Sequence, residues 1–88
     1  MSDRVYVLID AIEGKVGQLA QTLRDQPGVK VVDLLEGPPD VIVMLQARSR
    51  QKLAELTNRA LALVQAVTEN LQVLSVQNGY GMQAKQER

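Results

Sequence analysis

Two short runs of the sequence contain only apolar and aromatic residues, and they restrict the fold more than any other feature of the chain. Residues 5–9 read Val-Tyr-Val-Leu-Ile, and residues 41–45 read Val-Ile-Val-Met-Leu. Successive side chains of a β-strand point to opposite faces of its sheet, so each run predicts a strand that is apolar on both faces. A sheet built around such strands needs a cover on each side.

Two stretches with apolar residues at three- and four-residue spacing predict helices. The first helix runs to about Asp25, and its apolar face consists of Val16, Leu19, Ala20 and Leu23. The second begins after Ser49, a residue type that caps helix N-termini. Its predicted apolar face consists of Leu53, Leu56, Ala60, Leu63, Val64 and Val67.

Two further strands complete the pattern. Pro27 and Gly28 end the first helix and lead into a strand at residues 29–35. The Gly37-Pro38-Pro39 turn then connects to residues 41–45, a connection short enough for an antiparallel hairpin, and a last strand is expected at residues 70–76. The order strand, helix, strand, strand, helix, strand is that of the ferredoxin-like α+β fold (βαββαβ), in which two helices cover one face of an antiparallel sheet.

The length of 88 residues suits one hydrophobic core, so we expect one domain at residues 1–77 and a flexible polar tail at residues 78–88. The helices of this domain would cover only one face of the sheet. Burying about a dozen aliphatic side chains on the other face would contribute roughly 1.5–3 kcal/mol each before entropic losses, beside a typical stability of about 5–15 kcal/mol. The sequence therefore predicts a homodimer that packs sheet to sheet, an assembly of the dimeric α+β barrel type.

The composition excludes several classes of function. Lys plus Arg and Asp plus Glu each number 10, so the net charge is zero and gives no attraction for nucleic acid or an anionic membrane. The chain has no Cys and no His, which removes thiolate nucleophiles, imidazole bases and the usual zinc ligands. We therefore expect no enzyme activity, no metal and no cofactor. The first apolar run ends at Asp10, too early for a signal or membrane segment, which predicts a cytoplasmic protein.

Several short segments occur in an order and spacing that resemble a known family. They are Val7-Leu8-Ile9-Asp10 followed by Gly14-Lys15, then Gln26-Pro27-Gly28-Val29, then Glu36-Gly37-Pro38-Pro39-Asp40-Val41, and finally Thr68-Glu69-Asn70-Leu71. The set resembles the effector-binding domain of the leucine-responsive and asparagine regulators, the Lrp/AsnC family, in the stand-alone form that lacks a helix-turn-helix. The resemblance covers about residues 5–76.

The resemblance implies an assembly and a ligand site. Family members form dimers whose sheets face each other, the dimers often join into a ring of eight chains (an octamer), and amino acids bind between dimers. The family's effector-binding positions fall on Gly37, Asp40, Thr68 and Asn70. Pro39 stands where the family commonly has an aromatic residue, and Asn70 where it has a second Thr. Without a DNA-binding domain, regulation would act through mixed oligomers with full-length regulators.

The residues of this predicted site also allow simpler interpretations. Gly37 can serve a turn that needs a positive φ, or it can offer its backbone amide to a ligand carboxylate. Asp40 can accept backbone hydrogen bonds after the prolines, or it can receive the ammonium of an amino acid. Thr68 and Asn70 can be ordinary polar residues at the start of a strand.

Two groups of charged residues are weaker candidates for sites. Asp10 and Asp33 lie at or within predicted strands, and a desolvated carboxylate pair could do acid–base chemistry, although nothing in their spacing requires it. A cluster of cations lacks interleaved aromatic residues and is expected on the solvated side of the second helix rather than at a phosphate site. These cations are Arg48, Arg50, Lys52 and Arg59.

The sequence thus predicts a small-molecule-binding and oligomerisation module of a transcription regulator family, with an amino acid as the expected effector. Two rival functions stay open. One is a structural or chaperone-like partner that adds its sheet or an edge strand to another protein. The other is a dimeric α+β barrel enzyme, a monooxygenase or isomerase for a hydrophobic substrate, which the absence of His and Cys disfavours.

Overall fold

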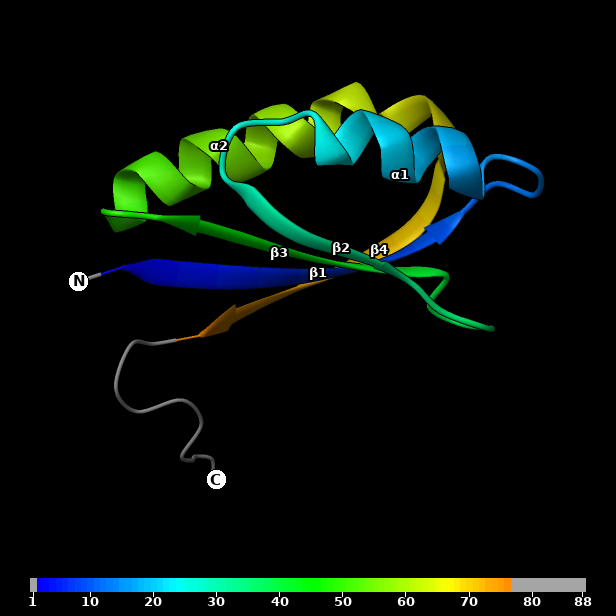
Figure 1. Ribbon diagram of the computed structural model, residues 1–88, viewed down its shortest axis with the longest axis horizontal. Coiled ribbons are helices and arrows are strands. Elements are labelled where there is room, and N and C mark those ends of the chain that lie inside the picture. The colour runs from blue at the N-terminus through cyan, green and yellow to red at the C-terminus, as the bar shows by residue number, and fades with distance from the viewer. Residues whose placement is uncertain (1, 77–88) are drawn as a thin grey trace.

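The structure is a computed structural model that describes residues 2–76, and its elements follow the predicted order (Figure 1). They are strand β1 (Asp3–Ala11), helix α1 (Val16–Arg24), strands β2 (Val29–Leu34) and β3 (Val41–Ala47), helix α2 (Arg50–Leu63), the 3-10 helix η1 (Gln65–Val67) and strand β4 (Thr68–Val76). The predicted tail at residues 78–88 lies outside the described residues. The ferredoxin-like α+β fold is confirmed.

The four strands form one antiparallel sheet in the order β2-β3-β1-β4. The two uninterrupted apolar runs are the central strands β1 and β3. Both helices lie against the same face of the sheet, as predicted, and leave the opposite face bare in the single chain (Figure 1). Among the described residues, no helix is long and apolar enough to cross a bilayer.

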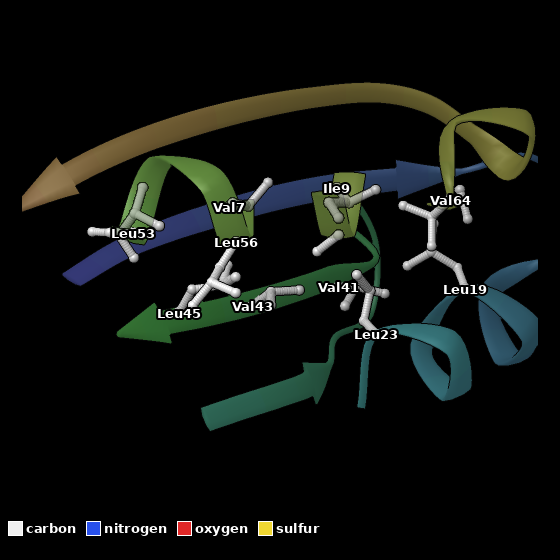
Figure 2. Close-up of a cluster of buried hydrophobic side chains, with 13 residues drawn as sticks. Val7, Ile9, Leu19, Leu23, Val41, Val43, Leu45, Leu53, Leu56 and Val64 are labelled. Atoms are coloured by element: carbon white, nitrogen blue, oxygen red, sulfur yellow. The ribbon is translucent and has the colours of Figure 1, made fainter. Parts of the chain in front are cut away.

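The core lies between the helices and the sheet (Figure 2). Every second residue of β1 points into it, as do Val41, Val43 and Leu45 of β3. Leu19 and Leu23 come from α1, Leu53 and Leu56 come from α2, and Val64 directly follows α2. The buried cluster consists of Val5, Val7, Ile9, Ala11, Leu19, Leu23, Val41, Val43, Leu45, Leu53, Leu56, Ala60 and Val64. It is wholly aliphatic.

The bare side of the sheet, which we call the open face, is apolar at its centre. The strand registers place Tyr6 beside Met44 on one side and beside Leu74 on the other, and Met44 in turn beside Val31. A row of four apolar or aromatic side chains therefore crosses all four strands. The central strands are apolar on both faces, as predicted. In the single chain this row is only partly buried.

The turn between α1 and β2 depends on a glycine. Gly28 has φ +87°, and a Cβ built on it would lie 2.7 Å from Cδ1 of Leu56. Both observations require glycine, because L-residues avoid this φ and carbon atoms cannot approach so closely. The Gly28 carbonyl also accepts a hydrogen bond from the backbone amide of Gln46 at 2.9 Å, which holds the turn against β3.

The ends of α2 test two details of the sequence analysis. Ser49 is the N-cap, as predicted, because its hydroxyl accepts a hydrogen bond from the Lys52 amide at 3.1 Å. The prediction that Leu63 belongs to the buried face is wrong, since this side chain is 56% exposed. The helix ends at Leu63 and the chain turns into η1, so Ala60 and Val64 make the core contacts there instead.

Candidate functional site

Asp40 fastens the turn between β2 and β3 to the end of β1. Its backbone amide donates a hydrogen bond to the Ile9 carbonyl at 3.0 Å, and its carbonyl accepts one from the Leu35 amide at 2.8 Å. Its carboxylate oxygen Oδ2 accepts a hydrogen bond from the Ala11 amide at 3.0 Å. The pairing of β1 with β4 shifts its register between Asp10 and Ala11, so the side chain of Asp40 pairs a backbone group at an irregular point of the sheet.

A shallow hollow, which we call the turn hollow, lies beside this turn. Its volume is about 470 Å³, and it is lined by Asp10, Ala11, Gly37, Pro38, Asp40, Glu69 and Asn70. Three of the four predicted site residues, Gly37, Asp40 and Asn70, therefore lie together. The lining carries three carboxylates and no cation, so its charge favours a ligand with a positively charged group.

Gly37 has a conformation that favours glycine on backbone grounds. Its φ is +80°, and a Cβ built on it would meet no heavy atom within 4 Å. The positive φ confirms the simpler of the two interpretations of this residue, a turn that needs glycine. Its contact with an effector stays a prediction.

Asp10 holds the most unusual polar atom of the site. Its Oδ1 is buried and has no hydrogen-bond partner among the described residues. Asp10 pairs with Asn70 across β1 and β4, so the carboxylate and the carboxamide come from neighbouring positions of adjacent strands. A buried polar atom without a partner is costly, which favours occupation of this position by a hydrogen-bond donor.

A second hollow continues from the first, and we call it the proline hollow. Its volume is about 230 Å³, and it is lined by Leu8, Asp10, Pro38, Pro39, Asn70, Leu71 and Gln72. The two hollows share Asp10, Pro38 and Asn70. One end is therefore acidic, and the other combines two prolines with Leu8. This pairing of an acidic end and an apolar end suits a small amphiphilic cation.

Thr68, the fourth predicted site residue, lies apart from the other three. Its hydroxyl donates a hydrogen bond to the Val64 carbonyl at 2.8 Å, in the turn that leads into β4. It lines a separate hollow between α2 and β4, together with Asn58, Leu61 and Leu71 among others. Its part in effector binding stays a prediction.

The weaker candidates of the sequence analysis are not assembled into sites. Asp33 pairs with Ile42 of β3, whereas Asp10 lies on β1, two strands away, at a spacing of roughly 10 Å. The two carboxylates therefore do not form an acid–base pair. The four cations of the predicted solvated face are all exposed, as expected. Within residues 2–76, no group of His, Cys, Asp and Glu could hold a metal ion.

The two other acidic residues of the turn hollow are not among the site residues predicted from the sequence. Asp10 enters the sequence analysis as part of a family segment and as a possible partner of Asp33, and Glu69 enters it as part of a family segment. The available signal for Asp10 was its position, since an acid directly follows an apolar strand. Its closeness to Asn70, 60 positions later in the chain, depends on the pairing of β1 with β4, which no local pattern specifies.

Comparison with known proteins identifies the fold. No family model and no curated protein matches the sequence. The protein TTHA0845 from Thermus thermophilus is similar in structure, with a TM-score of 0.76 and 19% identity over 91% of this chain and 99% of that one. PH0061 has a TM-score of 0.76 and 20% identity over 88% of this chain, which spans 53% of PH0061.

A transcriptional regulator also has this fold. NMB0573 from Neisseria meningitidis, solved in complex with L-Met, has a TM-score of 0.67 and 12% identity over 91% of this chain and 53% of that one. The present chain thus spans about half the length of that regulator and of PH0061. The fold implied by the resemblance to the Lrp/AsnC effector-binding domain is confirmed.

The same fold occurs in proteins with other names. NapD, a Tat proofreading chaperone from E. coli, has a TM-score of 0.60 and 13% identity over 100% of this chain and 83% of that one. A putative antibiotic biosynthesis monooxygenase from Nitrosomonas europaea has a TM-score of 0.63 and 14% identity over 90% of this chain and 91% of that one. The fold alone therefore does not define the function.

Proposed function

We propose that this chain is a small-molecule-binding and oligomerisation module of a regulatory system, and that its effector is an amino acid. The proposal rests on the fold, which a regulator solved with L-Met shares, and on the turn hollow. It does not require catalysis, a metal or a cofactor. A cytosolic location, expected from the sequence, is part of the proposal.

The observation that carries the proposal is the unpartnered Oδ1 of Asp10 in a hollow that also contains Asp40. The ammonium group of an amino acid has three donors and a positive charge, so it can satisfy this oxygen and a second carboxylate together. The carboxamide of Asn70 can donate a hydrogen bond to the ligand carboxylate. A small apolar side chain can then occupy the proline hollow.

The hollow is shallow, and several of its lining residues are exposed in the single chain, including Gly37, Pro38 and Asn70. Small-molecule sites are usually more enclosed, because most of the ligand surface has to be removed from water. This supports a site that a neighbouring copy closes. Binding of a ligand at such a boundary stabilises the assembled state, which links effector concentration to assembly.

The assembly itself is part of the proposal. The apolar row on the open face supports a homodimer that packs sheet to sheet, since a second sheet is its simplest cover. Larger assemblies, including a ring of eight chains, would follow from contacts between dimers. Regulation of transcription would require mixed oligomers with full-length regulators, because no DNA-binding element lies in the described residues.

The direct test is a thermal-shift screen of the twenty amino acids, followed by calorimetry. A ligand at 100 times its Kd stabilises the folded state by about 2.7 kcal/mol, which raises Tm by roughly 10 °C or more in a domain of this size. The matched control for each active amino acid is its α-hydroxy acid, which lacks the ammonium and should not bind. The absence of any amino acid that raises Tm would contradict the proposal.

A chaperone-like role is the second candidate, favoured by the apolar open face and by the similarity to NapD. In this case the open face would bind a peptide segment of another protein, and no amino acid would raise Tm. A stable complex with one defined protein, together with a negative amino-acid screen, would support it. The two candidates therefore predict opposite results in the same pair of experiments.

A further inference from the structure

The two edge strands of the sheet, β2 and β4, differ in how well they are protected against pairing with another strand. An edge strand exposes unpaired backbone groups, and proteins usually guard it with charges, proline or a bulge. On β2, Lys30 and Asp33 are exposed charges, and the pairing with β3 shifts register between Val29 and Val31. On β4, the register shift against β1 and the charge of Glu69 are confined to the start of the strand, and residues 70–76 contain no charge and no proline. The β4 edge is therefore open to pairing with another strand.

The helix side of β4 is also uncovered. Leu71 and Val73 pair with Ile9 and Val7 of β1, so they point to the side of the sheet that carries the helices. Ile9 and Val7 are completely buried, whereas Leu71 is 41% exposed and Val73 is 44% exposed. The helices thus cover β1 but not β4. An apolar strip lies beside the unprotected edge, and a strand added there would bury it.

We infer that β4 pairs with β4 of a second copy, antiparallel and about a two-fold axis at Gln72, to give a continuous eight-stranded sheet. This interface is separate from the open face. The two-fold axis stands perpendicular to the sheet, so the helices of both copies lie on the same side.

The side chains of β4 favour a register in which Gln72 pairs with Gln72 of the second copy. In this register Leu71 of each copy lies opposite Val73 of the other copy. The apolar strips of the two copies therefore meet on the helix side. A register centred on Leu71 would place Glu69 opposite Val73, an acid against an apolar residue. A register centred on Val73 would place Leu71 opposite Ser75 and break the strip. Of these three registers, only the one about Gln72 gives both Leu71 and Val73 an apolar partner.

Charge complementarity supports the same register. Glu69 lies three residues before Gln72, at the register shift between β1 and β4, so the two-fold axis brings it level with Ser75 of the other copy. Ser75 lines a small hollow of about 150 Å³ with Asp3, Arg4, Arg50, Leu53 and Val76. This hollow contains two cations and one acid, and Arg50 begins α2 on the helix side. The acidic end of one β4 strand therefore meets the basic end of the other.

Disulfide trapping tests the register, because the chain has no native cysteine. The Met44→Lys substitution, placed on the open face, removes sheet-to-sheet pairing and serves as the background. In this background, Gln72→Cys should form a disulfide-linked dimer on mild oxidation, since residues opposite each other in antiparallel strands have Cα atoms about 4.5–5.5 Å apart. The matched control is Ser75→Cys, whose counterpart is Glu69. Equal trapping of both variants, or trapping of neither, would overturn the inference.

A charge exchange gives an independent readout. In the Met44→Lys background and without added amino acid, Glu69→Arg and Arg50→Glu should each raise the dimer dissociation constant by roughly 5- to 30-fold, since each creates two like-charge pairs. The double variant restores both pairs with opposite polarity and should return the constant to near its starting value. Sedimentation equilibrium measures all four proteins. A double variant no better than the weaker single variant would refute the contact between Glu69 and Arg50.

Discussion

The Asp40 carboxylate accepts a hydrogen bond from the backbone amide of Ala11 at 3.0 Å, across 29 positions of the sequence. This contact gives Asp40 a structural role, and the second carboxylate oxygen is left for the proposed ligand. The same residue therefore serves the fold and the turn hollow, and substitutions can separate the two roles.

Asp40→Ala should lower the free energy of unfolding by about 1–3 kcal/mol, because it leaves the partly buried Ala11 amide without its acceptor. Asp40→Asn keeps an oxygen that can accept the hydrogen bond from the Ala11 amide, so it should lower the free energy of unfolding by less. Both substitutions remove the charge and should weaken amino-acid binding equally. Urea denaturation and calorimetry on the two variants check this. Equal stability of Asp40→Ala and the unchanged protein would contradict the structural role.

The close approach of Gly28 to Leu56 gives a second prediction. Gly28→Ala should destabilise the fold by roughly 2–4 kcal/mol, combining an unfavourable φ with a Cβ only 2.7 Å from the Leu56 side chain. Gly14→Ala is the matched control, since Gly14 has φ +84° and open space around it, so only the cost of φ remains, about 1–2 kcal/mol. Denaturant unfolding should therefore separate the two variants. Equal losses of unfolding free energy in the two variants would show that the contact with Leu56 is unimportant.

The correction at Leu63 predicts a difference between a buried leucine of α1 and an exposed leucine of α2. Leu19→Ala should cost about 2–5 kcal/mol, because Leu19 is completely buried and truncation leaves a cavity. Leu63→Ala should change stability by no more than about 0.5 kcal/mol, because the side chain is mostly exposed. Thermal unfolding of both variants measures the difference. A large loss for Leu63→Ala would mean that a partner chain covers this residue.

Sheet-to-sheet pairing predicts that Met44→Lys lowers the molecular mass in solution, since it places a charge in the middle of the apolar row. The control is Ile12→Lys, because Ile12 is also an exposed apolar residue but lies outside the strands. Light scattering at micromolar concentration reports the mass. If Met44→Lys and Ile12→Lys leave the mass equally unchanged, the open face is not an interface.

Much of the fold could be predicted from the sequence because its signals are local. The uninterrupted apolar runs, the helical spacing and the Pro-Gly turn each specify an element within about ten residues. The end of α2 could not be predicted in this way. Leu63 fits the helical spacing, but whether it is buried depends on what lies opposite the last turn, which only the packed structure defines.

The candidate site could be predicted only in part, because some of its residues are brought together by local sequence and others by the packed fold. Gly37 and Asp40 belong to one turn, so their proximity is local. Asn70 joins them through the pairing of β4 with β1, and the resemblance to a family supplied that link before the structure did. Asp10 could not be placed in the hollow because its importance comes from burial and from a missing partner. Both are properties of the packed structure rather than of a pattern.

The measurement that tests the central claim most directly is calorimetry of the best amino acid from the screen on Asp10→Asn. The substitution keeps the shape of the side chain and removes the charge that would receive the ligand ammonium. A charge-assisted contact of about 1.5–3 kcal/mol predicts a roughly 10- to 100-fold rise in Kd. Asp25→Asn, an exposed acid at the end of α1, is the control and should bind normally. Unchanged affinity of Asp10→Asn would contradict the account.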